Sequence, residues 1–135
     1  MPRLSVWLIR SALCHLAIGV LAGAVLLVNR GVFLGAWVGR LLPFHIEFLL
    51  IGWTLQLALG VAFWILPRFR AGSERGREGL VWLSYGLLNT GVLAVAVGQA
   101  IGLPPAVPLL GHTAEALAAA AFSLHAWPRI KVFGR

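Results

Sequence analysis

The chain has 135 residues, of which 60% are apolar and 11% are charged, and its formal net charge is +7. Its mean hydropathy is +0.91. A typical soluble domain is about 45–50% apolar and about 25% charged, so this composition excludes a soluble enzyme, a disordered tail and a disulfide scaffold. At about 20 residues per membrane-spanning helix, the length accommodates four spans. We therefore predict an all-α integral membrane four-helix bundle, a single membrane domain over residues 1–135.

The first predicted span covers residues 6–28. Its apolar run is longer than the hydrophobic region of a signal peptide, so we expect it to remain in the protein. Ser11, His15, Gly19 and Gly23 recur at every fourth position. Small residues at this spacing allow another helix backbone, or a flat ligand, to approach closely.

The second predicted span covers residues 44–66, between Pro43 and Pro67. At about 100° per residue, His45, Gly52, Gln56 and Phe63 fall within about 20° of one line. Polar residues and glycine on one face indicate that this face is turned toward the bundle.

Two other residues of the second span lie off this line. Gly60 is about 60° away, and Glu47 is about 160° from His45. We expect Glu47 to face the lipid headgroups rather than the bundle.

The third and fourth predicted spans cover residues 79–101 and 105–127, and Pro128 is expected to close the last helix. The third contains Tyr85 and Asn89 but no histidine. The fourth contains His112 and Glu115, which are neighbours at i, i+3 on a helix. Alanines at positions 116 and 118–121 allow tight packing of this helix.

The cations are divided unequally between the two ends of the predicted bundle. One end carries Arg3, Arg10, Arg68, Arg70, Arg75, Arg77, Arg129, Lys131 and Arg135, whereas the other carries only Arg30 and Arg40. The positive-inside rule therefore places both termini in the cytoplasm, with the chain in a bacterial-type inner membrane. The basic loops are expected to meet anionic lipid, and no nucleic acid partner is expected.

Histidines at membrane depth are functional candidates because the bilayer penalises polar side chains. His45 and His112 are predicted at a similar outer depth on different helices, and two such histidines can hold heme b between them. Glu115 would then fix the His112 ring through its second nitrogen. The alternative is that each histidine only makes hydrogen bonds near an interface, which is also the interpretation favoured for His15 and His125.

The second span carries a family resemblance. Its segments His45-Ile-Glu-Phe-Leu-Leu-Ile-Gly52-Trp53 and Gly60-Val-Ala-Phe-Trp64-Ile-Leu-Pro67-Arg68 resemble the second helix of heme-copper oxidase subunit I. The layout and the final Trp127-Pro128-Arg129 resemble short four-span proteins described as cytochrome c oxidase subunit I-like.

The resemblance implies that His45 is a heme ligand and that Gly52, Gly60 and Pro67 are scaffold positions. The later helices, which carry the copper and oxygen-site ligands of an oxidase, have no counterpart here. We therefore do not expect this chain alone to reduce oxygen. The candidate cofactor-binding residues are His45, His112, His15, Gly52, Gly60 and Gln56, with His45 and His112 as candidate ligands of heme iron.

Three functions remain open at this point. The first is a heme b protein that acts in electron transfer or as an accessory subunit of a respiratory membrane complex, as a homo-oligomer or within a larger assembly. The second is a heme-free protein that assembles or stabilises a larger complex. The third is a small transporter, which is disfavoured because the first span contains no acidic residue.

Overall fold

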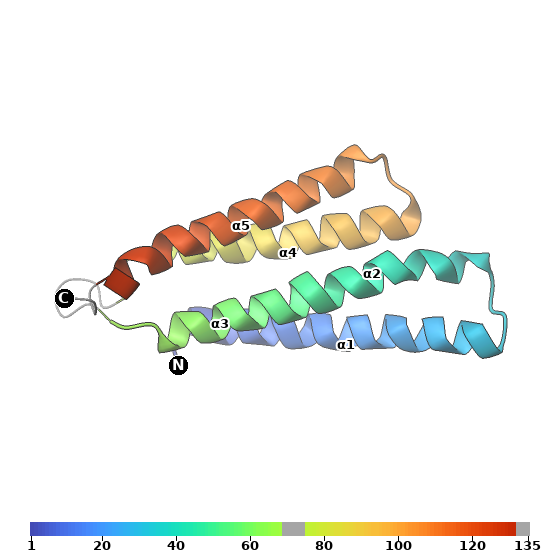
Figure 1. The fold of residues 1–135 in the computed structure, drawn as a ribbon, viewed down its shortest axis with the longest axis horizontal. Coiled ribbons are helices and arrows are strands. Elements are labelled where there is room, and N and C mark those ends of the chain that lie inside the picture. The colour runs from blue at the N-terminus through green and yellow to red at the C-terminus, as the bar shows by residue number, and fades with distance from the viewer. Residues whose placement is uncertain (69–74, 132–135) are drawn as a thin grey trace.

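The computed structural model describes residues 1–68 and 75–131, with the side chain of Lys131 left out. All secondary structure in this part of the chain is helical, which confirms the predicted all-α class (Figure 1). The elements are α1 (Arg3–Gly31), the 3₁₀ helix η1 (Ala36–Arg40), α2 (Leu41–Glu47), the π-helical segment η2 (Phe48–Leu55), α3 (Gln56–Ile65), α4 (Glu78–Ile101) and α5 (Ala106–Lys131).

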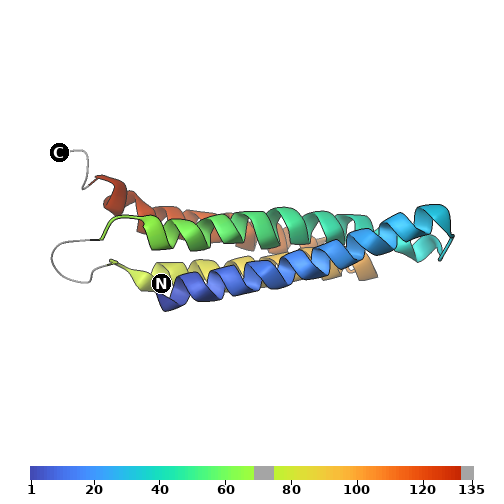
Figure 2. The same ribbon diagram turned by 90° about the horizontal axis from the view of Figure 1, so that it is seen from below.

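Four helical rods in the described ranges are long and apolar enough to cross a membrane: Arg3–Gly31, Ala36–Ile65, Glu78–Ile101 and Ala106–Ile130. They run alternately up and down, so that the N-terminus, the end of α3 and the end of α5 lie together (Figures 1 and 2). We call this the terminal end, and the opposite end, with residues 32–35 and 102–105, the distal end. The sequence predicts that both terminal segments and the connection between the second and third spans lie at the same end of the bundle, and the described residues confirm this. Arg70, Glu74 and Arg135 lie outside the described residues.

The second rod begins earlier than the predicted residue 44. Gly35 has a φ of 144°, a conformation suited to glycine, and the 3₁₀ helix η1 starts directly after it. The side-chain oxygen of Asn29 accepts hydrogen bonds from the backbone N–H groups of Leu34 at 2.8 Å and Gly35 at 3.3 Å. This local turn orders the connection and allows η1, α2, η2 and α3 to continue as one rod.

The last helix does not end before Pro128, as the sequence pattern predicts, but continues to Lys131 with Pro128 inside it. Proline removes one backbone hydrogen bond from a helix interior. The contacts of Arg129, described below, hold the final turn against α3 and so compensate for this loss.

The rods pack as two hairpins, with α1 against α2, η2 and α3, and α4 most extensively against α5. A core of Leu4, Leu8, Phe63, Val81 and Phe122 joins the hairpins near the terminal end. Many large apolar side chains of the rods, such as Leu110, Leu117 and Leu124 of α5, point outward. An apolar exterior around a small polar interior is the arrangement that a bilayer favours.

Candidate functional site

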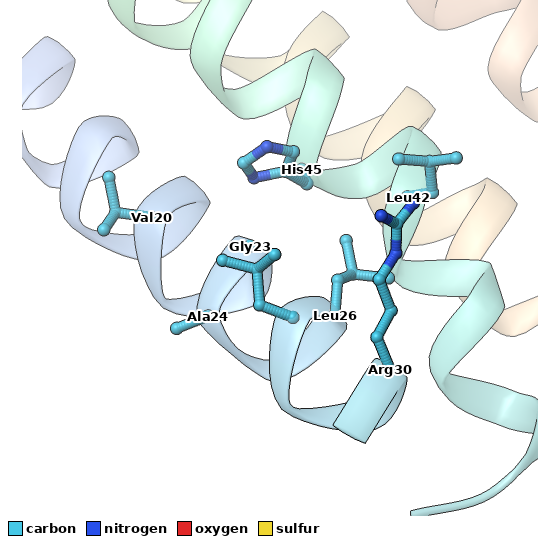
Figure 3. Close-up of a pocket in the computed structure, with 8 residues that line it drawn as sticks. Val20, Gly23, Ala24, Leu26, Arg30, Leu42 and His45 are labelled. Carbon is cyan, nitrogen blue, oxygen red and sulfur yellow. The ribbon is translucent and has the colours of Figure 1, made fainter. Parts of the chain in front are cut away.

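His45 of α2 points toward α1 (Figure 3). Its Nδ1 atom lies 2.7 Å from the carbonyl oxygen of Gly19 on that helix. A carbonyl only accepts, so Nδ1 carries the hydrogen and donates it, which leaves the lone pair on Nε2. The ring lies against Gly23, where an added Cβ atom would be 2.6 Å from Cε1 of His45. Gly23 therefore allows a close approach, as predicted, and the group that approaches it is the His45 ring.

Beside His45 lies a groove of about 490 Å³ between α1 and α2. Its walls are apolar, from residues such as Val20, Leu26 and Leu42, and Arg30 and His45 are its ionisable residues (Figure 3). The groove is open along one side. It can therefore take an apolar group that a partner covers on the other side, with Arg30 available for an anionic substituent.

His15 of α1 makes the reciprocal contact. Its Nδ1 atom lies 3.0 Å from the carbonyl oxygen of Gly52 in η2, and its ring covers Gly52, where an added Cβ atom would be 2.8 Å from Cγ of the ring. Each of the two helices thus donates a histidine N–H to a backbone carbonyl of the other. His15 thus makes a hydrogen bond between two helices of the bundle, and the residue is only 6% exposed.

Gln56 lies on the interior face that the helical pattern predicts, and Gly60 of the same rod is buried as well. Gln56 is fully buried, and its Nε2 atom donates to Oδ1 of Asn89 on α4 at 3.4 Å. Gly60 packs against α1, where an added Cβ atom would lie 3.0 Å from Cβ of Leu8. Both positions bring neighbouring helices together, and Gly60 has no contact with the groove beside His45.

His112 lies in a different contact region from His45. Its Nδ1 atom is 3.1 Å from Oε2 of Glu115, which confirms the expected pairing of these two side chains. One ligand atom from each of Glu47, His112 and Glu115 lies within 4.8 Å of the others. In the described residues, His45 therefore contacts α1, whereas His112 lies beside the carboxylates of Glu47 and Glu115.

The expectation that Glu47 faces the lipid headgroups is wrong, because the residue is only 8% exposed. The helical angle correctly separates Glu47 from His45, but α2 has neighbours on both sides, α1 on one and α4 on the other. The face opposite His45 is consequently a second interior face. The sequence signal was an acidic residue within an apolar span. Its interior position could be recognised only once the helices on both sides of α2 were known.

Arg129 is the second residue whose role the sequence missed. The sequence pattern places Arg129 in a basic segment beyond the fourth span, whereas the residue is only 1% exposed and its Cζ atom lies 5.5 Å from the centre of the Phe63 ring. Its Nε atom donates to the carbonyl oxygen of Pro67 at 2.8 Å, and Nη2 donates to that of Leu66 at 2.6 Å. The side chain thus binds the carbonyl groups at the end of α3, a favourable place for a cation.

No known protein family, curated protein or solved structure matches this chain. The resemblance to heme-copper oxidase subunit I therefore stays a prediction from the sequence.

Proposed function

We propose that this protein is a multi-pass membrane protein that binds heme b in the groove between α1 and α2, where His45 would be one ligand of the heme iron. The observation that carries the proposal is the orientation of His45. Its Nδ1–H group donates to Gly19, and Nε2 has no hydrogen-bond partner among the described residues. Histidines that bind metals typically donate their other ring N–H to a carbonyl in this way.

The surroundings of His45 fit such a group. Apolar walls suit a porphyrin, and Arg30 would pair with a propionate. Bound heme would supply one-electron transfer, and iron held by two imidazoles has no open position for oxygen. Because His112 is not among the residues that line this groove, the second ligand would come from another copy of the chain or from another subunit of a respiratory complex.

The test is the visible spectrum and pyridine hemochrome of the purified full-length protein, expressed with added hemin. We expect a Soret band in the unaltered protein and its loss in His45→Asn. The asparagine amide can still donate to Gly19 but lacks an atom equivalent to Nε2, so folding is preserved. The matched control His112→Asn should keep the heme. An unaltered protein without iron, or a His45→Asn variant with full heme content, contradicts the proposal.

A second candidate function, a heme-free subunit that assembles or stabilises a larger complex, is favoured by the reciprocal His15–Gly52 and His45–Gly19 hydrogen bonds. These contacts give both histidines a structural role without a cofactor. Retention of native membrane partners by the His45→Asn variant, together with an absence of heme in the unaltered protein, would support this second function.

We also propose that the terminal end lies in the cytoplasm, in a bacterial-type inner membrane. The described residues Arg3, Arg10, Arg75, Arg77 and Arg129 belong to that end, whereas Arg30 and Arg40 belong to the distal end. A green fluorescent protein fused to the C-terminus should fluoresce, and alkaline phosphatase fused there should be inactive. The opposite pattern would reverse the orientation.

A further inference from the structure

Three side chains that can bind a metal ion meet near the distal end of the bundle. Glu47 comes from α2, and His112 and Glu115 come from α5, with ligand atoms all within 4.8 Å of one another. Two atoms bound to one ion at about 2.1 Å with tetrahedral geometry lie about 3.4 Å apart. Small side-chain rotations would therefore bring all three groups onto a single ion.

The oxygen atoms of the two carboxylates provide an independent indication of a ligand. Glu47 and Glu115 are each only 8% exposed, and the Oε1 atom of each is buried without a hydrogen-bond partner. Buried polar atoms are nearly always satisfied, and an exception in a folded protein points to a bound ion or water. Two ionised carboxylates so close together in an apolar bundle also need a compensating positive charge, which a metal cation or a proton can supply.

The helices α4 and α5 are shaped to seat Glu115 at this place. A Cβ atom added to Gly91 of α4 would lie 2.8 Å from Cγ of Glu115 and 2.9 Å from the carbonyl oxygen of Gly111. A Cβ atom added to Gly111 would in turn lie 2.6 Å from a methyl group of Val95. The two glycines therefore let the helix backbones touch, and the Glu115 side chain passes over Gly91 toward Glu47.

We propose that Glu47, His112 and Glu115 bind a divalent first-row transition metal ion, for which Zn²⁺ is the probe. One imidazole nitrogen and two carboxylate oxygens form a ligand set that Zn²⁺ accepts, whereas Ca²⁺ and Mg²⁺ prefer oxygen ligands alone. Two carboxylates and one neutral imidazole balance the charge of the ion. The resulting neutral site suits an apolar environment.

The position of the site indicates both how an ion enters and what it does. The His112 side chain is 51% exposed, and the residue lies about 9 Å along the axis from the start of α5, at 1.5 Å per residue. The ion can therefore reach the site from the distal surface. Because the ligands come from α2 and α5, the ion would connect the two hairpins at the end opposite to Arg129.

The experiment measures Zn²⁺ binding by the full-length protein in lipid nanodiscs, after removal of the affinity tag and treatment with a chelator. We expect one Zn²⁺ per chain by elemental analysis and calorimetry. Glu47→Gln and Glu115→Gln should each weaken binding at least about tenfold, since even residues that only support ligands contribute about 10–100-fold. Cobalt substitution should give a visible spectrum that both variants lose.

Two controls separate this site from other sources of binding. Glu78→Gln, which alters an exposed acid of α4 at the terminal end, should leave the affinity unchanged. His45→Asn should also keep Zn²⁺ binding, because His45 belongs to the heme proposal, and the iron content reports on that proposal separately. A protein that binds no Zn²⁺, or Glu47→Gln and Glu115→Gln variants with unaltered affinity, overturns the metal site and indicates that the carboxylates hold only a proton.

Discussion

Arg129 donates a hydrogen bond from Nη1 to Nε2 of His125, one turn earlier on α5, at 3.0 Å. Nε2 must then be the acceptor, so Nδ1 carries the ring hydrogen and donates it to the carbonyl oxygen of Arg77 at 3.1 Å. Together with the bonds from Arg129 to Leu66 and Pro67, these contacts join the end of α5, the end of α3 and the start of α4. A single buried arginine thus connects three helices at the terminal end.

Replacing Arg129 should destabilise the bundle strongly. In Arg129→Ala the carbonyl groups of Leu66 and Pro67 lose a charged donor, and we expect the free energy of unfolding to fall by about 2–4 kcal/mol. Arg129→Lys should recover only part of this, because an ammonium group cannot reproduce the planar arrangement of donors. Unfolding in mixed detergent micelles measures the change.

The matched control for Arg129 is Arg3→Ala, which removes an exposed cation from the same end. It should alter the free energy of unfolding by less than about 0.5 kcal/mol. Equal effects of the two substitutions would show that the Arg129 contacts do not contribute to stability.

A methyl group at Gly23 should disturb the contact between α1 and α2. Its Cβ atom would lie 2.6 Å from Cε1 of His45, so the ring must move and its hydrogen bond to Gly19 is lost. We expect Gly23→Ala to cost about 1–2 kcal/mol in a detergent unfolding assay. Gly31→Ala is the control on the same helix, since nothing lies within 4 Å of the added atom, and it should be close to neutral.

The contact between α4 and α5 should be more sensitive to an added methyl group than the contact between α1 and α2. In Gly91→Ala the added methyl group meets a backbone carbonyl, that of Gly111, which cannot rotate away as a side chain can. The helices must separate, and we expect a loss of about 2–3 kcal/mol together with weaker Zn²⁺ binding.

Gly86→Ala on the same helix meets nothing within 4 Å and serves as the comparison. Alanine is the better helix former, so this variant should be neutral or more stable by up to about 1 kcal/mol. If Gly91→Ala behaved in the same way as Gly86→Ala, the close approach of α4 and α5 would be refuted.

A hydrogen bond between α1 and α4 should contribute modestly to the free energy of unfolding. Oγ of Ser11 on α1 and the hydroxyl oxygen of Tyr85 on α4 are 2.8 Å apart. A double-mutant cycle with Ser11→Ala and Tyr85→Phe should give a coupling energy of about 0.6 kcal/mol, the average for hydrogen bonds between membrane helices. Strictly additive effects would mean that the two hydroxyl groups do not interact.

The sequence was a good guide wherever a property belongs to one helix. Apolar runs indicate the four rods, and the four-residue spacing of His15, Gly19 and Gly23 indicates the face of α1 that packs on the second rod. Ser11 of the same series contacts Tyr85 of α4 instead. These features follow from the local periodicity of a helix, so no neighbouring element is needed to interpret them.

Helix boundaries were less accurate, because they depend on contacts outside the helix. The second rod starts early since Asn29 and Gly35 order the preceding turn. The last rod continues past Pro128, where Arg129 contacts the end of α3. The π-helical segment η2 has more residues per turn than an α-helix. Angles calculated at a constant 100° per residue therefore do not describe how residues before η2 are oriented relative to residues after it.

The sequence alone determined the helical class, the number of rods and the unequal distribution of cations, because each is a sum over local composition. Only the tertiary structure decided which side chains meet. A helical angle specifies a direction from one axis but not the helix that lies in that direction. For this reason His45 could be paired with His112 on depth alone, whereas the packed bundle places His45 against Gly19 and brings His112 and Glu115 to Glu47.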